Sequence, residues 1–299
     1  MSWVYKFTTL AMTFFSTGPL EGKRGLAWPW YNENTNLDPA KFTDGHNRVR
    51  WYLYMLFKES LIVKIITILD PGSITLCSHL NWIGMQRCMD CDSSPISQLK
   101  TRAQQQGWNT VLTLNEPDIN GISAPAAAQW YIQHINPLKI KKAIPAVTSS
   151  ATPGKGLDWT ADFISACAGH CQFDFINIHW YGHNFNEFKS HVQKAHSRFP
   201  NHKLIISEFA LLAPADRDHQ VAFLKSAMSF LDGADYVKYY AVFIASSPTK
   251  ISANKGGGDV GIGSSLYEND GSLSTNGIAY CGVRIVTFAI AGREDYGLK

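Results

Sequence analysis

Charge is scarce in this sequence, and neither sign dominates. Asp, Glu, Lys and Arg make up 17% of its 299 residues, and 27 Lys and Arg against 24 Asp and Glu leave a formal net charge of +3. No run of five or more like charges occurs. A protein that binds nucleic acid usually carries a clustered basic surface, so we expect no nucleic-acid partner.

Long hydrophobic runs are also missing. The longest apolar stretches, Leu61–Leu69 and Phe7–Phe15, fall short of the roughly 20 residues that cross a bilayer, so we expect no membrane span. Phe7–Phe15 follows Lys6 and ends in small residues, which is the pattern of a weak secretory signal. We therefore expect residues 1–21 to be a signal peptide or an irregular N-terminal arm. No Asn-x-Ser/Thr sequon supports secretion independently.

The six cysteines leave two interpretations open. An even number in a chain of low charge is compatible with disulfides and an oxidising compartment, and Cys167 and Cys171 are close enough in sequence for a local disulfide. Alternatively, Cys88, Cys91 and the second pair, together with His170, imitate a zinc site. No short Cys/His spacing links the two pairs, and no βαβ pattern surrounds Cys88 and Cys91. We expect no metal and no cofactor.

Short apolar runs alternate with segments of helical period from about residue 80 onward. This order is typical of parallel β/α units, and runs without polar alternation suit strands that are buried on both faces. With two segments upstream, the sequence predicts eight strands: Arg24–Trp28, Val49–Tyr54, Trp82–Gln86, Thr110–Asn115, Lys142–Val147, Phe173–His179, Lys203–Glu208 and Val237–Ile244. It predicts helices over Ser94–Gln106, Ser123–Ile135, Asp158–Ala168 and Asn186–Phe199, and another after Pro214 that stops before Gly233.

Eight parallel strands in a chain of this length favour a single-domain α/β fold, the (β/α)8 TIM barrel, over an open doubly wound sheet. No Gly-rich phosphate loop follows any of these strands. Segment 55–80 does not fit, because it is too long for a simple β/α connection and its apolar run has no helical period. The tail 283–299 has no place in the eightfold pattern either. We expect the barrel to cover residues 22–282.

Two acidic residues stand where strands end. Glu116 follows the strand Thr110–Asn115, and Glu208 closes the strand that begins at Lys203. Catalytic residues of such barrels lie at the C-terminal ends of the strands, so the two carboxyl groups are expected to face one another across the mouth. Glycoside hydrolysis needs such a pair, one protonated and one ionised. Pro117 is expected to keep Glu116 extended, and the Asn115 amide to reach a sugar hydroxyl.

A third strand end adds His179, Trp180 and Tyr181. We expect His179 and Tyr181 to hydrogen-bond Glu208 and hold it ionised, which separates the pKa values of the two carboxyl groups. His179 and His183 have the spacing of a zinc pair on a helix, but the intervening Trp-Tyr-Gly argues against a helix. Several aromatic residues near loops and strand ends are candidates for stacking on sugar rings, with core burial as the alternative: Trp28, Trp30, Trp159, Trp180 and Phe209.

The sequence carries a series of motifs at these strand ends. They are Lys23–Trp30 (KRGLAWPW), Asn115–Asp118 (NEPD), Pro145–Thr148 (PAVT), Cys167 and Cys171 followed by Asp174–Ile176 and His179–Gly182, and Ser207–Ala210 (SEFA). In combination they resemble glycoside hydrolase family 128, whose domain is called the glycosyl hydrolase catalytic core. The resemblance covers about residues 22–54 and 80–282.

The resemblance implies a (β/α)8 barrel that cleaves β-1,3-glucan of the fungal cell wall with retention, without a cofactor or metal. By motif, Glu116 corresponds to the general acid/base and Glu208 to the nucleophile. Asn115, His179, Trp180 and Tyr181 then line the substrate site, with Arg24 and Trp28 near its floor and rim. The partner is a polysaccharide, the location is outside the cell or in the cell wall, and we expect a monomer.

Two departures from the family pattern keep alternatives open. The second strand runs into the anomalous segment 55–80, and the run after Phe209 lacks a further aromatic residue. One alternative is therefore a catalytically weak cell-wall protein that binds polysaccharide on the same barrel. Another is a barrel glycosidase for a different β-glycan.

Overall fold

The structure is a computed structural model that describes residues 22–42, 49–55, 81–254 and 257–282. The predicted N-terminal segment 1–21, residues 56–80 of the anomalous segment and the tail 283–299 lie outside the described residues. None of the described helices is both long and apolar enough to cross a membrane.

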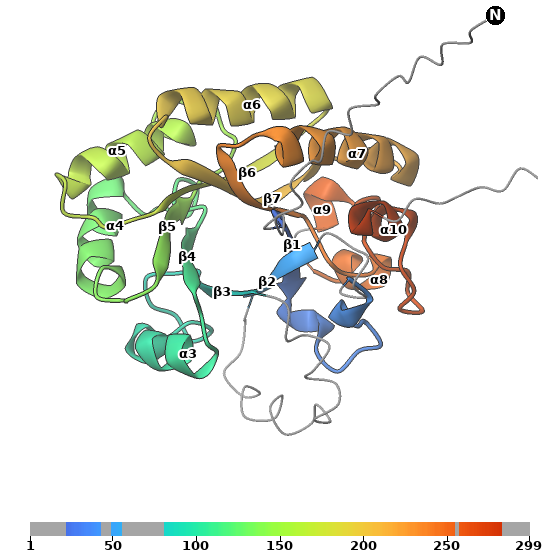
Figure 1. The fold of residues 1–299 in the computed structure, drawn as a ribbon, viewed down its shortest axis with the longest axis horizontal. Coiled ribbons are helices and arrows are strands. Elements are labelled where there is room, and N and C mark those ends of the chain that lie inside the picture. Colours follow the sequence, from blue (N-terminus) through green and yellow to red (C-terminus); the bar gives the residue numbers. More distant parts are fainter. Residues whose placement is uncertain (1–21, 43–48, 56–80, 255–256, 283–299) are drawn as a thin grey trace, which may run out of the picture.

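Eight parallel strands follow one another around the sheet (Figure 1). They are β1 (Arg24–Pro29), β2 (Val49–Met55), β3 (Asn81–Gln86), β4 (Thr110–Asn115), β5 (Lys141–Ala146), β6 (Phe175–Gly182), β7 (Lys203–Leu211) and β8 (Val237–Val242). Each strand pairs with the next, and β1 also pairs with β8, so the strands form a closed ring. The contact between β5 and β6 is sparse, with Ala143 and Phe175 as its register pair. The predicted parallel α/β architecture is confirmed.

Helices follow the strands from β3 onward: α3 (Leu99–Gln105), α4 (Ala124–Trp130), α5 (Leu157–Cys167), α6 (Phe185–Arg198) and α7 (Arg217–Gly233). Side-chain caps begin three of them, because Ser123, Asn184 and Asp216 each accept a hydrogen bond from a backbone N–H in the first turn. The boundaries of several helices differ from prediction, and α7 includes Gly233, before which it was expected to stop. Ile96–Gln98 forms a 3-10 turn before α3, and α4 continues as a π-helical turn over Tyr131–Ile135.

Three short helices follow β8: α8 (Pro248–Ser252), α9 (Gly257–Val260) and α10 (Thr275–Cys281). The sequence did not predict α10, whose first turn is capped by Ser274. Among the described residues no α-helix follows β1 or β2. After β1 the chain forms 3-10 turns at Trp30–Asn32 and Pro39–Phe42. The strict alternation of strand and helix is thus visible from β3 to α7.

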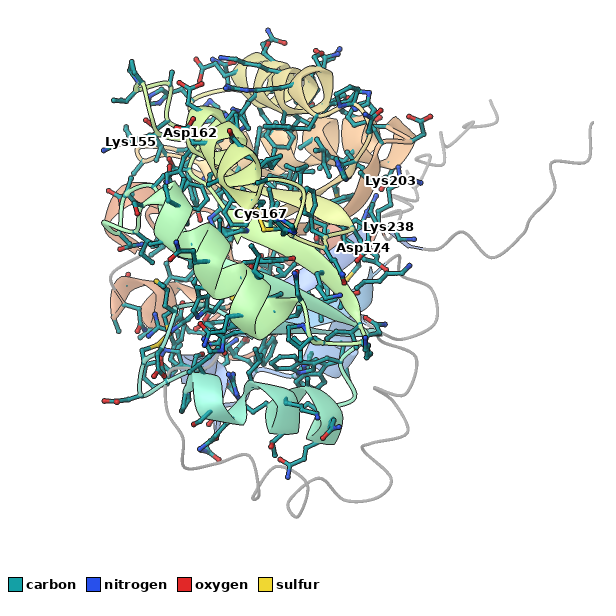
Figure 2. All side chains as sticks on the ribbon, turned by 90° about the vertical axis from the view of Figure 1, so that its left-hand side faces the viewer. Lys155, Asp162, Cys167, Asp174, Lys203 and Lys238 are labelled. Carbon is teal, nitrogen blue, oxygen red and sulfur yellow. A yellow bond between two sulfur atoms is a disulfide. The ribbon has the colours of Figure 1, made fainter. Side chains whose placement is uncertain are left out.

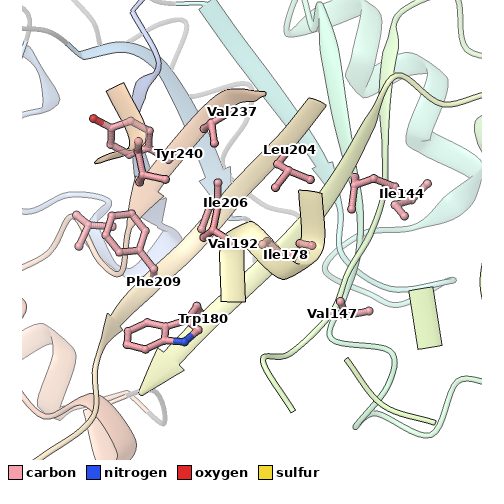
Figure 3. Close-up of a cluster of buried hydrophobic side chains, with 14 of the residues drawn as sticks. Ile144, Val147, Ile178, Trp180, Val192, Leu204, Ile206, Phe209, Val237 and Tyr240 are labelled. Atoms are coloured by element: carbon pink, nitrogen blue, oxygen red, sulfur yellow. The ribbon is translucent and has the colours of Figure 1, made fainter. Parts of the chain in front are cut away.

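Trp180 of β6 and Phe209 of β7 belong to a cluster of buried hydrophobic side chains that also includes Val192 of α6 (Figure 3). Trp180 lies 3% exposed in this cluster, stacked on Phe223 with ring centroids 5.6 Å apart. Phe209 is fully buried and stacks on Phe188 at 5.0 Å. Alternate residues of a strand point to opposite faces, so Trp180 faces the helices while His179 and Tyr181 face the barrel interior. The prediction that Trp180 lines the substrate site is wrong for this reason.

Arg24 lies at the N-terminal end of β1, the end of the barrel away from the predicted site. Its guanidinium donates hydrogen bonds to the Tyr240 hydroxyl at 2.7 Å, the Tyr280 carbonyl at 2.9 Å and Asp232 Oδ2 at 2.6 Å. Arg24 is 5% exposed. It therefore ties β1 to β8, α7 and α10, and its predicted place near the substrate site is wrong.

Two disulfides close short loops. Cys88 is bonded to Cys91 in the loop after β3, and Cys167 at the end of α5 is bonded to Cys171 (Figure 2). The predicted local bridge between Cys167 and Cys171 is therefore present, and these four sulfur atoms are not zinc ligands in this structure.

Candidate active site

Glu116 stands directly after β4 in an unusual backbone conformation. Its φ angle is +48°, in the left-handed region that residues other than glycine rarely adopt. The expectation that Pro117 keeps Glu116 extended is wrong. The conformation is held by hydrogen bonds on both sides, since the Glu116 N–H donates to the Ala146 carbonyl at 2.8 Å and the Asn115 N–H to the Arg87 carbonyl at 2.8 Å. Neighbouring strand ends thus fix the backbone that carries this carboxyl group.

Glu208 reaches the interior through an irregularity of β7. Ile178 pairs with Ile206, but the next residue of β6, His179, pairs with Glu208, so Ser207 is an extra residue on β7. Such a bulge changes the direction in which the following side chains point. The backbone of β7 therefore brings both Ser207 and Glu208 next to His179.

His179 joins the two carboxyl groups. Its Nδ1 lies 3.0 Å from Glu116 Oε1 and 3.6 Å from Glu208 Oε2. The two oxygens are therefore at most 6.6 Å apart, the sum of 3.0 Å and 3.6 Å. The carboxyl groups of Glu116, after β4, and Glu208, in β7, therefore both lie beside the His179 imidazole. His179 forms its hydrogen bond with Glu116 and not with Glu208.

Burial and the neighbouring charges set the protonation of the site. Burial raises the pKa of Glu208, although His179 and the hydrogen bond from Tyr181 oppose this shift. Burial alone would lower the pKa of His179, but Glu208 and Glu116 outweigh it and raise that pKa. Burial and the adjacent Glu208 keep the pKa of Tyr181 well above its ordinary value, so its hydroxyl keeps its proton. His179 and Glu208 are buried, so these charges interact strongly.

Tyr31, which the sequence reasoning missed, also belongs to this site. It follows β1, forms a side-chain hydrogen bond with Ser246 beyond β8 and interacts electrostatically with Glu208. Burial raises the pKa of Tyr31 to about 12. Asn32 strengthens the same connection, since its Nδ2 donates to the Ala245 carbonyl at 2.7 Å. The signal available in the sequence was a pair of aromatic residues, Trp30 and Tyr31, just after the first strand.

The remaining predicted residues divide between the site and the core. Asn115 is the last residue of β4 and stands half-buried beside Glu116. Trp28 is 4% exposed and packs edge-on against Tyr267 at 6.0 Å, within the hydrophobic core cluster. Within the part of the chain that the structure describes, no group of three or more His, Cys, Asp or Glu is arranged to hold a metal.

The protein-family model described as glycosyl hydrolase catalytic core matches residues 25–280 of this chain. The chain is also 34% identical over 184 residues to alkali-sensitive linkage protein 1 of Schizosaccharomyces pombe. That alignment covers 58% of this chain and 33% of the relative, so the chain spans about a third of the relative's length.

Solved structures of family 128 resemble this chain as well. A subgroup IV endo-β-1,3-glucanase from Lentinula edodes is 48% identical, with a TM-score of 0.75, over 86% of this chain and 98% of that one. A subgroup III curdlan-specific exo-β-1,3-glucanase from Blastomyces gilchristii, in complex with glucose, is 24% identical, with a TM-score of 0.64, over 89% and 100%. The second similarity concerns the fold alone.

Proposed function

The chain belongs to the glycosyl hydrolase catalytic core family, as its motifs predicted, and we propose on that premise that it hydrolyses β-1,3-glucan with Glu116 as general acid/base and Glu208 as nucleophile. The substrate is inferred from the Lentinula edodes enzyme, which shares 48% of its sequence with this chain and is described as an endo-β-1,3-glucanase.

One observation supports the catalytic roles above all others, namely the convergence of two carboxyl groups on His179. Their oxygens are no more than 6.6 Å apart, the sum of 3.0 Å and 3.6 Å. Retaining glycosidases hold their carboxyl groups about 5–5.5 Å apart, whereas inverting enzymes need about 6.5–9.5 Å to admit a water molecule. The upper limit for this pair of oxygens lies at the lowest end of the inverting range, so it favours retention.

The proposed reaction has two steps. Protonated Glu116 gives its proton to the glycosidic oxygen while a Glu208 oxygen bonds to the anomeric carbon, and the bond to the leaving sugar breaks. Ionised Glu116 then takes a proton from water, whose oxygen bonds to the anomeric carbon and releases the Glu208 carboxylate. In this proposal Asn115, which lies beside Glu116, holds a hydroxyl of the reacting sugar.

The wider proposals follow from the same relatives. We propose that residues 22–282 form a complete (β/α)8 TIM barrel, with the helices after β1 and β2 belonging to residues outside those described. Two disulfides and the relationship to a linkage protein of a fungus support a protein that is secreted or held in the cell wall. A polysaccharide partner and a monomeric state complete the proposal.

The proposed substrate is tested by release of reducing ends from linear β-1,3-glucan, with chitin, mannan and β-1,4-glucan in parallel. The Glu208→Gln protein is the matched blank. We expect release from β-1,3-glucan alone, and none in the blank. Release from another polymer would contradict the substrate. Binding of β-1,3-glucan without release by either protein would indicate a polysaccharide-binding protein instead.

A further inference from the structure

Three polar side chains continue inward from the candidate site. His179 Nε2 lies 2.9 Å from Ser207 Oγ, which in turn donates to Asn177 Oδ1 at 2.9 Å. Asn177, His179 and Ser207 are 0%, 1% and 2% exposed. Ser207 is the bulge residue of β7, so the strand irregularity that directs Glu208 also places this hydroxyl against the imidazole.

The Asn177 amide is oriented with Oδ1 toward Ser207, and this orientation determines which atom donates in each contact of the series. A serine hydroxyl has one hydrogen, and Ser207 gives it to Asn177 Oδ1. Its oxygen can therefore only accept from His179, which means that Nε2 carries a hydrogen. The opposite nitrogen, Nδ1, faces the oxygens of Glu116 and Glu208 at 3.0 Å and 3.6 Å, and two carboxyl groups favour a donor there as well.

We propose that Asn177 and Ser207 are positioning residues that make His179 donate from both ring nitrogens, so that it stands as an imidazolium between the two carboxyl groups. The inference rests on the proposed roles of Glu116 and Glu208. In the free enzyme the positive charge compensates ionised Glu208. Once Glu208 is esterified and Glu116 has lost its proton, the same charge compensates Glu116 without any movement of the ring. One fixed cation thus serves whichever carboxylate is ionised.

The groups that face His179 all favour the charged ring. Glu116 and Asp118 approach from the end of β4, and Glu208 approaches from β7, carrying the hydrogen bond from Tyr181. These carboxyl groups raise the pKa of His179 against the effect of burial. Neither Asn177 nor Ser207 carries a charge, so their contribution is to accept the second ring hydrogen and to hold the orientation of the ring.

The direct test is a nitrogen-15 NMR spectrum of the imidazole rings of the full chain, with the His179 signal identified by its loss in His179→Asn. We expect both ring nitrogens of His179 to show protonated chemical shifts throughout the pH range of activity. An unprotonated Nε2 in that range would overturn the proposal. This measurement needs no turnover, so it is separate from the substrate assay, whose failure in the unaltered protein would instead refute the proposed function.

A kinetic test uses Ser207→Ala, which removes the acceptor for Nε2–H. We expect kcat to fall about tenfold with KM nearly unchanged. We also expect the acidic limb of the kcat/KM profile to move up by about one pH unit, because Glu208 loses its cationic neighbour. Ser207→Thr keeps the hydroxyl and should restore the position of the acidic limb. An unshifted limb in Ser207→Ala would overturn the proposal.

The matched control is Ser265→Ala, which also removes a fully buried serine hydroxyl, one that donates to the Ile262 carbonyl at 2.9 Å. A purely structural effect would lower the melting temperature of both variants and leave both pH profiles unchanged. If Ser207→Ala does not fold, the NMR spectrum of the unaltered protein still decides the question.

Discussion

The Tyr181 hydroxyl donates a hydrogen bond of 2.6 Å to Glu208 Oε2. Both residues face the interior from adjacent strands, and the pKa of Tyr181 stays so high that its proton is not lost at any working pH. The bond therefore acts on Glu208 alone, where it opposes the effect of burial on the carboxyl pKa. A buried nucleophilic carboxylate depends on such a hydrogen-bond donor to remain ionised.

Replacing Tyr181 by Phe removes that donor and leaves the ring. We expect the Glu208 pKa to rise further, so that the acidic limb of the kcat/KM profile moves to higher pH and kcat falls about tenfold, as for the loss of a hydrogen bond to a charged group. The measurement is a pH profile on a soluble β-1,3-glucan oligosaccharide. Tyr236→Phe is the control, since that phenol precedes β8 at the other end of the barrel. Equal profiles for the two variants would refute this role of Tyr181.

Glu208→Gln should make the protein inactive and more stable. The fold raises the Glu208 pKa above its ordinary 4.5, so the folded protein favours the protonated carboxyl more than the unfolded chain does. This contribution to the free energy of unfolding is lost as the pH rises from 4.5 through the raised pKa. Glutamine stays neutral and avoids that loss. We expect a melting temperature about 2 °C higher than in the unaltered protein near pH 7, with the gap closing below pH 4.5.

The comparison for this stability effect is Glu187→Gln. Glu187 lies in the first turn of α6, where its carboxylate accepts the His183 N–H at 3.0 Å and faces the positive end of the helix. We expect this variant to melt no higher than the unaltered protein. A lower melting temperature for Glu208→Gln near neutral pH would contradict the raised pKa.

Arg24→Leu should affect stability and leave catalysis unchanged. The substitution leaves the buried Tyr280 carbonyl without its hydrogen bond from Arg24 and removes one of the partners of Asp232, at a cost of about 3 kcal/mol in the free energy of unfolding. Chemical denaturation measures this loss, and kcat/KM of the folded protein should stay within about twofold. Arg198→Leu breaks an exposed ion pair with Asp158 and should have little effect on either quantity. A large rise in KM for Arg24→Leu would place Arg24 at the substrate after all.

Trp180→Ala and Asn115→Ala should show opposite effects. Trp180→Ala leaves a cavity among buried aromatic rings and should lower the free energy of unfolding by about 3–5 kcal/mol. The KM of the folded protein should be nearly unchanged. Asn115 is half-buried at the strand end, so its truncation should leave the melting temperature nearly unchanged and lower kcat/KM about tenfold or more. Denaturation and kinetics on both variants check the pair, and a reversed outcome would contradict the assignment of faces.

The strands and the two acids could be predicted because local sequence determines them. The unalternating apolar runs of β4 and β7 mark strands buried on both faces, and the polarity of a parallel barrel puts Glu116 and Glu208 at one end. A third rule, that neighbouring residues of a strand point to opposite faces, already separates Trp180 from His179. The polarity of the barrel also places Arg24, at the N-terminal end of β1, away from the site.

What the sequence could not give depends on contacts between distant segments. The extra residue Ser207 becomes visible only when the register of β6 against β7 is known, and this register brings Ser207 and Glu208 to His179. The left-handed backbone of Glu116 likewise depends on the Ala146 carbonyl of the next strand. Tyr31 enters the site through Ser246, which lies more than two hundred residues away in the chain.

The most direct test of the account is the configuration of the first product formed from a β-1,3-glucan oligosaccharide, followed by proton NMR before the sugar equilibrates. Two carboxyl groups held this close by His179, with Glu208 as nucleophile, predict a product of β configuration. The Glu208→Gln protein should form no product. An initial product of α configuration would show inversion and contradict the proposed roles of Glu116 and Glu208.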